Sequence, residues 1–259
     1  MITHLKGKLI EKDYAYAVDG DVYFRVRKFK GYGELSGRKV DDMISGSRIE
    51  VDKKKQDPLD FALWKAAAEG EPSWASPWGP GRPGWHIECS VMSASILGDH
   101  FDFHGGGRDL LFPHHENERA QSCSCTEKKF VNYWLHNGLL YLGDKKMSKS
   151  DGNFFAVGEV LEKFRPEVVR FFLLNAHFRS QIDYSEERLK EAESALDRLT
   201  RASVKLVENS EYAEKRDLTE GEQVILQSVA DYRRRFFESM DDDFNSAGAI
   251  GVLFSLSKE

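Results

Sequence analysis

The fold is set by residues 84–150, which begin with Gly84-Trp-His-Ile-Glu-Cys-Ser90 and end with Lys146-Met-Ser-Lys-Ser150. Two further motifs lie between them, His104-Gly-Gly-Gly-Arg-Asp109 and Phe112-Pro-His-His-Glu-Asn-Glu118. Apolar segments at residues 90–97 and 130–135 separate the motifs and are long enough to form alternating helices and strands. The pattern predicts an α/β sheet whose functional side chains lie on the connecting loops.

The segment before these motifs mixes several kinds of element. Residues 21–27 alternate as in a strand, and the glycines of residues 31–37 indicate a loop. Asp57-Pro58 predicts the start of a helix that continues to Ala67, with Phe61, Leu63 and Trp64 as its apolar residues. A loop rich in Gly, Pro and Trp follows over residues 70–84.

The last third is expected to be helical. Pro166 suits a first helical turn. From Ser185, a suitable N-cap, apolar residues recur three or four apart and predict a long amphipathic helix. Thr219-Glu-Gly-Glu222 is a capping box that predicts a second helix, and a third apolar segment begins at Ala247. Successive amphipathic helices imply a bundle domain.

Composition restricts the class of protein. The 259 residues are 41% hydrophobic and 31% charged, with a net charge of −6, which is typical of a soluble globular protein and excludes a uniformly basic nucleic-acid binder. No apolar run reaches the roughly 18 residues of a membrane-spanning helix, and the first residues do not resemble a secretory signal. Three cysteines are too few for a disulfide scaffold and suggest a reducing compartment, so we expect a cytoplasmic protein.

Three residues have the chemistry and spacing of metal ligands. His114 and Glu118 are four apart, so on a helix they share a face, whereas His115 and Glu116 point elsewhere. Cys89 precedes them by twenty-five residues, and thiolate, imidazole and carboxylate all bind zinc. Two alternatives stay open: these residues have ordinary structural roles, or Cys123 and Cys125 are the ligand pair.

The loop at residues 146–150 has the character of a phosphate-binding segment. Lys146 and Lys149 lie three residues apart among hydroxyl side chains, and such a loop can close over a triphosphate and neutralise the charge of departing pyrophosphate. Gly105, Gly106 and Gly107 lack side chains and would let a nucleotide approach the backbone. An exposed basic turn and an ordinary flexible loop are the alternative interpretations.

Taken together, these motifs resemble the cysteinyl-tRNA synthetase family of the class I aminoacyl-tRNA synthetases. Lys-Met-Ser-Lys-Ser is similar to the second signature of class I, and residues 84–90, 103–107, 112–118 and 240–245 resemble the cysteinyl enzymes specifically. Residues 32–37 and 57–65 match the same family, so the resemblance covers nearly the whole chain.

The resemblance implies a partial Rossmann-like catalytic domain followed by an α-helical bundle. It also implies that cysteine and ATP form cysteinyl-adenylate, which then passes cysteine to its tRNA, and that zinc binds the thiolate of the substrate. On this basis Cys89, His114 and Glu118 would bind zinc, Trp85 would form a wall of the amino-acid pocket, and magnesium would accompany ATP. Lys146 and Lys149 would be catalytic. ATP would be bound by His104, Gly105, Gly106, Gly107, Asp109, Lys146, Met147, Ser148, Lys149 and Ser150.

The expected domain organisation follows from the same comparison. Residues 1–80 would be a connective insertion and lead-in, residues 81–150 the second half of the catalytic domain, residues 151–185 a stem-contact linker, and residues 186–259 the start of an incomplete tRNA-binding bundle. The sequence lacks the His-Ile-Gly-His signature and the fourth zinc ligand, a cysteine before that signature. We therefore expect this chain to be a fragment, monomeric, and a poor catalyst or inactive alone.

Two other functions remain as alternatives. One is the related ligase that joins cysteine to an amino-sugar inositol by the same adenylate chemistry; it needs no tRNA, and the helices after Ser185 favour the tRNA enzyme over it. The other is a non-catalytic paralogue that binds tRNA. The missing signature favours the paralogue, and the retained lysine loop and zinc residues disfavour it.

Overall fold

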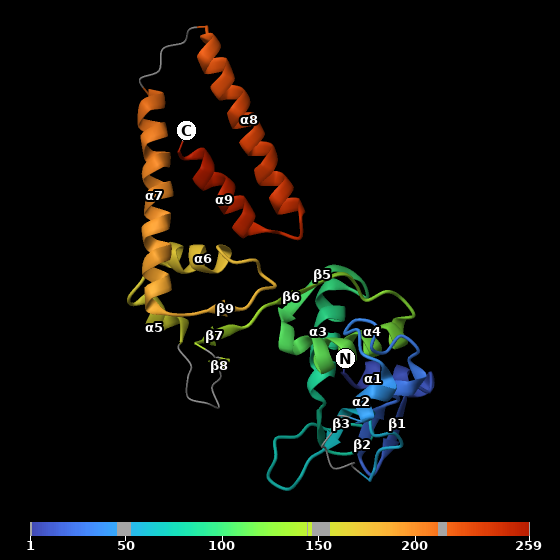
Figure 1. The fold of residues 1–259 in the computed structure, drawn as a ribbon. Helices are drawn as coiled ribbons and strands as arrows, with labels where there is room; N and C mark the ends of the chain where they lie inside the picture. The colour runs from blue at the N-terminus through green and yellow to red at the C-terminus, as the bar shows by residue number, and fades with distance from the viewer. Residues whose placement is uncertain (1, 46–52, 144, 147–155, 212–216, 259) are drawn as a thin grey trace. The chain divides into compact units, whose positions relative to one another are not determined.

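Figure 1 shows the computed structural model, which describes residues 2–45, 53–143, 145–146, 156–211 and 217–258. The chain divides into two compact units, Met1–His136 and Asn137–Glu259. The first unit combines helices with two sheets, and the described part of the second is largely helical. None of the helices in the described residues is long and apolar enough to cross a membrane.

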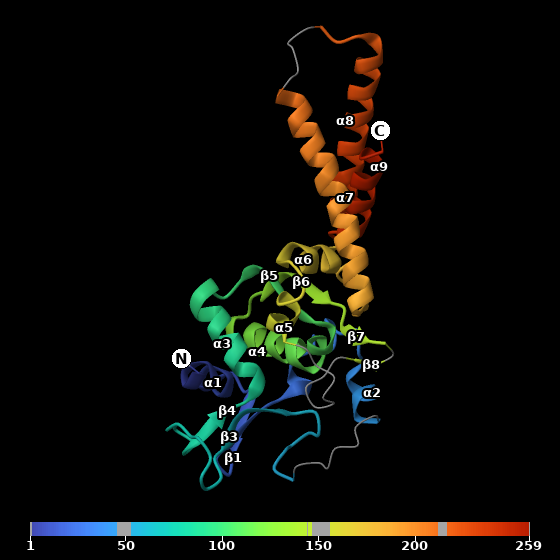
Figure 2. The same cartoon turned by 90° about the vertical axis from the view of Figure 1, so that its left-hand side faces the viewer.

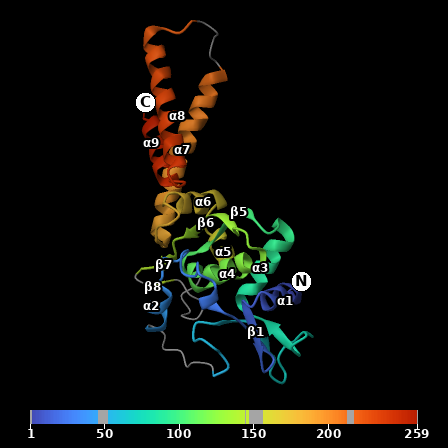
Figure 3. The same cartoon turned by 90° about the vertical axis from the view of Figure 1, so that its right-hand side faces the viewer.

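The first unit contains a four-stranded antiparallel sheet and a separate pair of strands. The larger sheet has the order β1-β2-β3-β4, with bounds β1 Ala15–Val18, β2 Asp21–Phe24, β3 Phe61–Ala66 and β4 Gly81–Pro83. The pair consists of β5 (Phe101–Gly107) and β6 (Val131–Asn137). The helices, of which α1, α3 and α4 pack together (Figure 3), are α1 Ile2–Glu11, α2 Val40–Ser45, α3 Trp85–Leu97 and α4 Glu116–Thr126.

The order α3, β5, α4, β6 confirms the expected alternation of helices and strands across residues 84–137. Helix α4 follows β5 after two short helical turns, Arg108–Leu110 and Leu111–His115, and leads back into β6. The motifs of this segment therefore lie at the start of α3, at the end of β5 and at the start of α4.

The predicted helix over residues 57–67 is wrong, because Phe61–Ala66 form strand β3. The buried carboxylate of Asp60 holds the chain at the strand entrance, accepting hydrogen bonds from Val26 N at 3.0 Å and Tyr16 Oη at 2.8 Å. Phe61 then stacks on Phe24 of β2, with ring centroids 5.0 Å apart. Pairing with β2 and β4 on both sides outweighs the helical spacing of the apolar residues.

The predicted strand at residues 21–27 is confirmed only over Asp21–Phe24, after which the chain turns at Val26–Lys28. All four residues of β2 are buried, so the strand lies inside the sheet rather than having one solvent face. Its apolar residues join the core of the first unit, which connects the sheet to α1, α3 and α4 through Leu9, Phe24, Leu63, Ile87 and Ala120.

The second unit is built around one long helix. Its helices are α5 Val157–Leu161, α6 Pro166–Leu174, α7 Glu186–Glu211, α8 Glu220–Asp241 and α9 Ser246–Leu256. Three short strands pair in the order β8-β7-β9, with bounds β7 Leu140–Leu142, β8 Lys145–Lys146 and β9 Ile182–Asp183. Helix α6 packs against α7, and α9 folds back along α8 (Figure 2).

The helix starts predicted at Pro166, Ser185 and Thr219 are confirmed. Pro166 occupies the first turn of α6, the Ser185 hydroxyl accepts a hydrogen bond from Arg188 N, and Thr219 and Glu222 form the capping box of α8. Leu189 of α7 is fully buried against α6, as its apolar face requires, but Leu206 near the other end of α7 is 70% exposed. Only the first turns of α7 thus have their apolar face covered by the described residues.

One buried cation in the first unit has no ionic partner among the described residues. Lys6 of α1 is fully buried, and its Nζ makes no hydrogen bond to them. The ammonium lies 3.5 Å from the ring centroid of Trp64 and 5.2 Å from that of Trp78. Indole faces attract a cation, but burial opposes the charged form and lowers the pKa of Lys6 from 10.5 to about 7.

We predict that Lys6→Met stabilises the protein most at pH 7 and below. Between pH 7 and 10.5 the unfolded chain binds more protons at Lys6 than the folded chain does, so wild-type stability rises with pH in this window. The advantage of the variant in the free energy of unfolding should therefore shrink as the pH rises to 10.5. Urea unfolding of both proteins at pH 6.5, 8 and 9.5 measures the difference in their free energies of unfolding. A difference that stays constant with pH would contradict the prediction.

Candidate metal centre

Cys89, His114 and Glu118 meet in the first unit, with one ligand-type atom of each within 4.8 Å of the others. They come from three places in the chain: Cys89 from α3, His114 from the turn before α4, and Glu118 from the first turn of α4. His114 Nε2 lies 2.7 Å from Glu118 Oε1, so the expected proximity of residues four apart is confirmed. Their role as metal ligands stays a prediction.

The two oxygens of Glu118 are buried without hydrogen bonds. Glu118 is 0% exposed, and neither Oε1 nor Oε2 accepts a hydrogen bond from any residue that the structure describes. The close approach of His114 Nε2 therefore does not have the direction of an N–H···O bond. A carboxylate in this position requires a proton or a cation, since an uncompensated buried charge is very costly.

Among the described residues, the imidazoles around Glu118 supply no positive charge at neutral pH. Burial lowers the pKa of His86 to about 4 and that of His115 to about 3, and it also lowers the pKa values of His104 and His114, so these imidazoles are neutral. Burial raises the pKa of Glu118 to about 8. A dication would replace the proton, and the donor set of thiol, imidazole and carboxyl fits zinc.

Cys89 is half-buried, and burial followed by the nearby Glu118 and Glu88 raises the pKa of its thiol. The thiol is thus protonated near neutral pH when no metal is bound. A bound dication would reverse this preference, because metal ions favour the thiolate. Binding a metal ion would therefore stabilise the charged forms of Cys89 and Glu118, which the metal-free protein disfavours.

A second group shares Glu118 with the first. His104 and His115 lie with Glu118 inside the same 4.8 Å limit, and His104 Nε2 is 3.4 Å from Glu118 Oε2. The expectation that His115 points away is wrong. The reason is that His115 has helical backbone angles (φ −67°, ψ −34°) and lies three residues before Glu118, and residues three apart share a helix face as residues four apart do.

Three histidines that lie close to Cys89, His114 and Glu118 or to their neighbours were not identified as site residues from the sequence: His86, His115 and His136. His86 Nδ1 lies 2.9 Å from His114 Nδ1, and His115 Nδ1 lies 2.8 Å from His136 Nε2. Two signals in the sequence could have found the others: His86 precedes Cys89 by three residues on one helix, and His136 lies at the end of strand β6, where functional residues gather in α/β sheets.

Some of the residues expected to bind substrate or ATP also lie at this cluster. The Trp85 ring packs on His114 with centroids 4.6 Å apart, yet Trp85 is 61% exposed, so the indole covers the cluster on its solvent side. His104 contacts Glu118 rather than standing apart from the metal residues. A Cβ at Gly106 would lie 2.9 Å from His115 Cε1, so this glycine lets the imidazole pack against the backbone.

The other expected residues are less closely defined by the structure. Gly105 lies against Leu135 of β6, Gly107 precedes the turn at residues 108–110, and Asp109 is exposed. Lys146 ends strand β8 of the second unit. Met147, Ser148, Lys149 and Ser150 lie outside the described residues.

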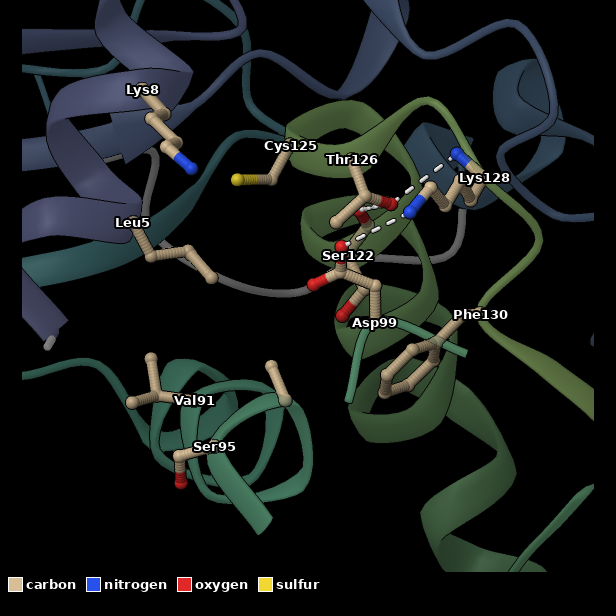
Figure 4. Close-up of a pocket in the computed structure, with 11 residues that line it drawn as sticks. Leu5, Lys8, Val91, Ser95, Asp99, Ser122, Cys125, Thr126, Lys128 and Phe130 are labelled. Atoms are coloured by element: carbon tan, nitrogen blue, oxygen red, sulfur yellow. Dashed lines mark hydrogen bonds and ion pairs between the residues drawn. The ribbon is translucent and has the colours of Figure 1, made fainter. Parts of the chain in front are cut away.

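The rival pair Cys123 and Cys125 receives no support. Within the described residues, neither thiol belongs to a group of potential metal ligands. Cys125 instead lines a pocket of about 360 Å³ between α1, α3 and α4, together with Lys8, Val91 and Ser122 (Figure 4). The residues that line this pocket include none of Cys89, His114 and Glu118, so the pocket is separate from the proposed metal site.

Comparison with known proteins identifies two families. Residues 1–194 match the family model described as tRNA synthetases class I (C) catalytic domain, and residues 235–259 match the DALR domain. Among curated proteins, the chain is 54% identical over 260 residues to a cysteine–tRNA ligase of Pelotomaculum thermopropionicum, covering 100% of this chain and 53% of that protein. It is 56% identical over 251 residues to the cysteine–tRNA ligase of Shouchella clausii, covering 97% and 53%. The chain thus spans about half the length of these relatives.

Solved structures share the fold at low sequence identity. A ternary complex of LeuRS, tRNA and LeuAMS from Agrobacterium radiobacter is similar with a TM-score of 0.55 and 13% identity, over 76% of this chain and 28% of that one. A putative arginyl-tRNA synthetase from Campylobacter jejuni gives a TM-score of 0.56 and 10% identity, over 99% and 51%. These likenesses support the expected architecture of a class I synthetase catalytic domain followed by a helical domain.

We predict that the purified chain binds one zinc ion and that Cys89→Ala and Glu118→Gln each remove most of it. Each substitution deletes one of three donors, and the remaining two do not hold zinc firmly. Cys123→Ala is the matched control and should retain zinc like the wild type. Metal analysis after loading and desalting measures the content; equal zinc in Cys89→Ala and the wild type would disprove the site.

Proposed function

The chain belongs to the class I tRNA synthetase family, and from this membership we propose that it serves the ATP-dependent ligation of L-cysteine to its tRNA through a cysteinyl-adenylate. The observation that carries the proposal is the cluster of Cys89, His114 and Glu118, whose donors suit an ion that recognises sulfur. The names of the relatives, cysteine–tRNA ligases, support the same substrate.

Selection of cysteine over serine explains why such a site would contain zinc. An apolar pocket separates near-isosteres by only about 1–3 kcal/mol. Zinc, when bound by these three residues, favours a thiolate over an alcohol and lowers the pKa of a coordinated thiol. These three donors leave positions of the ion open for the substrate thiolate and for the fourth protein ligand that the family resemblance implies.

Trp85 is proposed to form the wall of the amino-acid pocket. Its ring packs on His114 with centroids 4.6 Å apart and remains 61% exposed, so a small side chain that reaches His114 would pass beside the indole. This placement would exclude bulky side chains from the metal-binding residues. It would also remove water from the thiol, which strengthens the electrostatic interactions around it.

ATP is proposed to bind beside this pocket. The side chain of His104 contacts Glu118, and His104 directly precedes Gly105–Gly107 in the chain. It therefore lies where the amino-acid and nucleotide sites would meet. Lys146 and Lys149 would hold the triphosphate, with magnesium, and stabilise the charge on pyrophosphate. The substrate carboxylate is itself the nucleophile at the α-phosphate, so the residues act chiefly by positioning and electrostatics.

The tRNA is proposed to contact the helical part of the chain in a cytoplasmic, monomeric enzyme. The match of residues 235–259 to the DALR domain supports the tRNA enzyme over the cysteine–amino-sugar inositol ligase. Helices α7 and α8 carry more acidic than basic residues, so a contact with RNA there would need a local basic surface such as the one at Arg233-Arg-Arg235 of α8.

We predict that the zinc-loaded chain binds cysteine at least tenfold more tightly than serine, because only cysteine offers a thiolate. Titration calorimetry with cysteine, serine and alanine measures the difference. In Cys89→Ala the preference should fall to a few-fold, whereas Cys123→Ala should keep it. Equal affinities for cysteine and serine in the zinc-loaded wild type would refute the proposed substrate recognition.

A further inference from the structure

We propose that His86 is a positioning residue that holds the imidazole of His114 in the tautomer and orientation needed to bind the metal through Nε2. The inference rests on the proposed function, since it concerns the same metal site. It starts from a contact that the ligand set does not explain: the Nδ1 atoms of these two histidines lie 2.9 Å apart inside the protein.

The position of His86 is tightly defined by its neighbours. It is the second residue of α3 and is 8% exposed. Phe61 of β3 meets its ring edge-on, with centroids 5.6 Å apart and an interplanar angle of 90°, and Trp85 lies against it at 5.2 Å. Because the sheet and the helix both hold this ring, it can act as a fixed partner for His114.

Proton positions follow from the geometry of His114. Its Nε2 faces Glu118 Oε1 at 2.7 Å, so Nε2 is the nitrogen directed at the other proposed ligands. A nitrogen that binds a metal must present its lone pair, which places the proton of neutral His114 on Nδ1. That N–H then donates to His86 Nδ1, and His86 carries its own proton on Nε2.

His86 does not act as a ligand itself. Among the described residues, the groups of potential ligands around Glu118 contain His104, His114 and His115 but not His86. Its contact is with the far side of His114, which is where partners of metal-bound histidines donate or accept a hydrogen bond and fix the ring. Loss of such a partner typically weakens metal binding about 10- to 100-fold.

Two isosteric substitutions separate this role from simple packing. In His86→Asn the amide oxygen can occupy the position of Nδ1 and accept the same hydrogen bond, whereas in His86→Gln the polar atoms reach only the position of Nε2. Both side chains are polar and similar in size, so both variants should fold. His100→Gln is the control, because His100 is an exposed histidine whose Nδ1 contacts Lys129 O.

The test measures the zinc dissociation constant of the full chain by competition with a chromophoric chelator, and the visible spectrum of the cobalt-loaded protein. We expect His86→Asn and His100→Gln to bind zinc within about threefold of the wild type. His86→Gln should bind 10- to 100-fold more weakly and show a shifted cobalt spectrum. Thermal unfolding of the metal-free variants shows whether each remains folded.

Each other result has a definite meaning. If His86→Gln binds zinc like the wild type while Cys89→Ala does not, His86 has no positioning role and the proposed metal site stands. If His86→Asn is as weak as His86→Gln, the hydrogen bond at Nδ1 is not what matters and the inference is overturned. If the wild type itself binds no zinc, both the inference and the metal-dependent part of the proposed function fail.

Discussion

The burial of the Glu118 carboxylate is the constraint on which the rest of the site depends. Its oxygens are sealed from solvent and lack hydrogen-bond donors among the described residues, and the imidazoles around it are neutral at pH 7. A proton or a metal ion must therefore balance its charge. With a thiol and an imidazole directed at the same point, a dication satisfies all three groups, and the fold holds these groups in place without it.

Several anchors in the first unit fix the elements that carry these donors. The N–H of Gly84 bonds to Leu63 O at 2.9 Å, and a Cβ at Gly84 would lie 1.9 Å from Ala62 O, so only glycine lets α3 begin this close to β3. Helix α4 is tied to the loop before α2: Tyr32 Oη donates to Asn117 Oδ1, and Ser36 N donates to Glu116 Oε2. Backbone packing thus positions Cys89, His114 and Glu118 before any ligand arrives.

Much of this arrangement could be predicted from the sequence, because the donors are chemically distinctive and their spacing is local. His114 and Glu118 lie four apart, and the resemblance to the synthetases linked them to Cys89. The helix caps at Ser185 and Thr219 were equally local. The helix predicted over residues 57–67 was wrong because strand pairing with distant segments decides their structure. His115 was set aside because only the four-residue spacing was considered, although residues three apart on a helix, such as His115 and Glu118, also share a face. The spacing of His86 and Cys89 could have placed His86 near the site, but its contact with His114, 28 residues further along the chain, depends on the fold.

Zinc K-edge X-ray absorption of the zinc-loaded chain tests most directly whether Cys89, His114 and Glu118 bind a metal ion that also binds the sulfur of the substrate. If Cys89, His114 and Glu118 hold the ion, the spectrum should show one protein sulfur at about 2.3 Å and nitrogen or oxygen donors at about 2.0–2.2 Å. Adding cysteine should raise the sulfur count to two, and adding serine should leave it at one. A zinc shell without sulfur would contradict the proposed metal site, and a sulfur count that does not change with cysteine would contradict binding of the substrate thiolate to zinc.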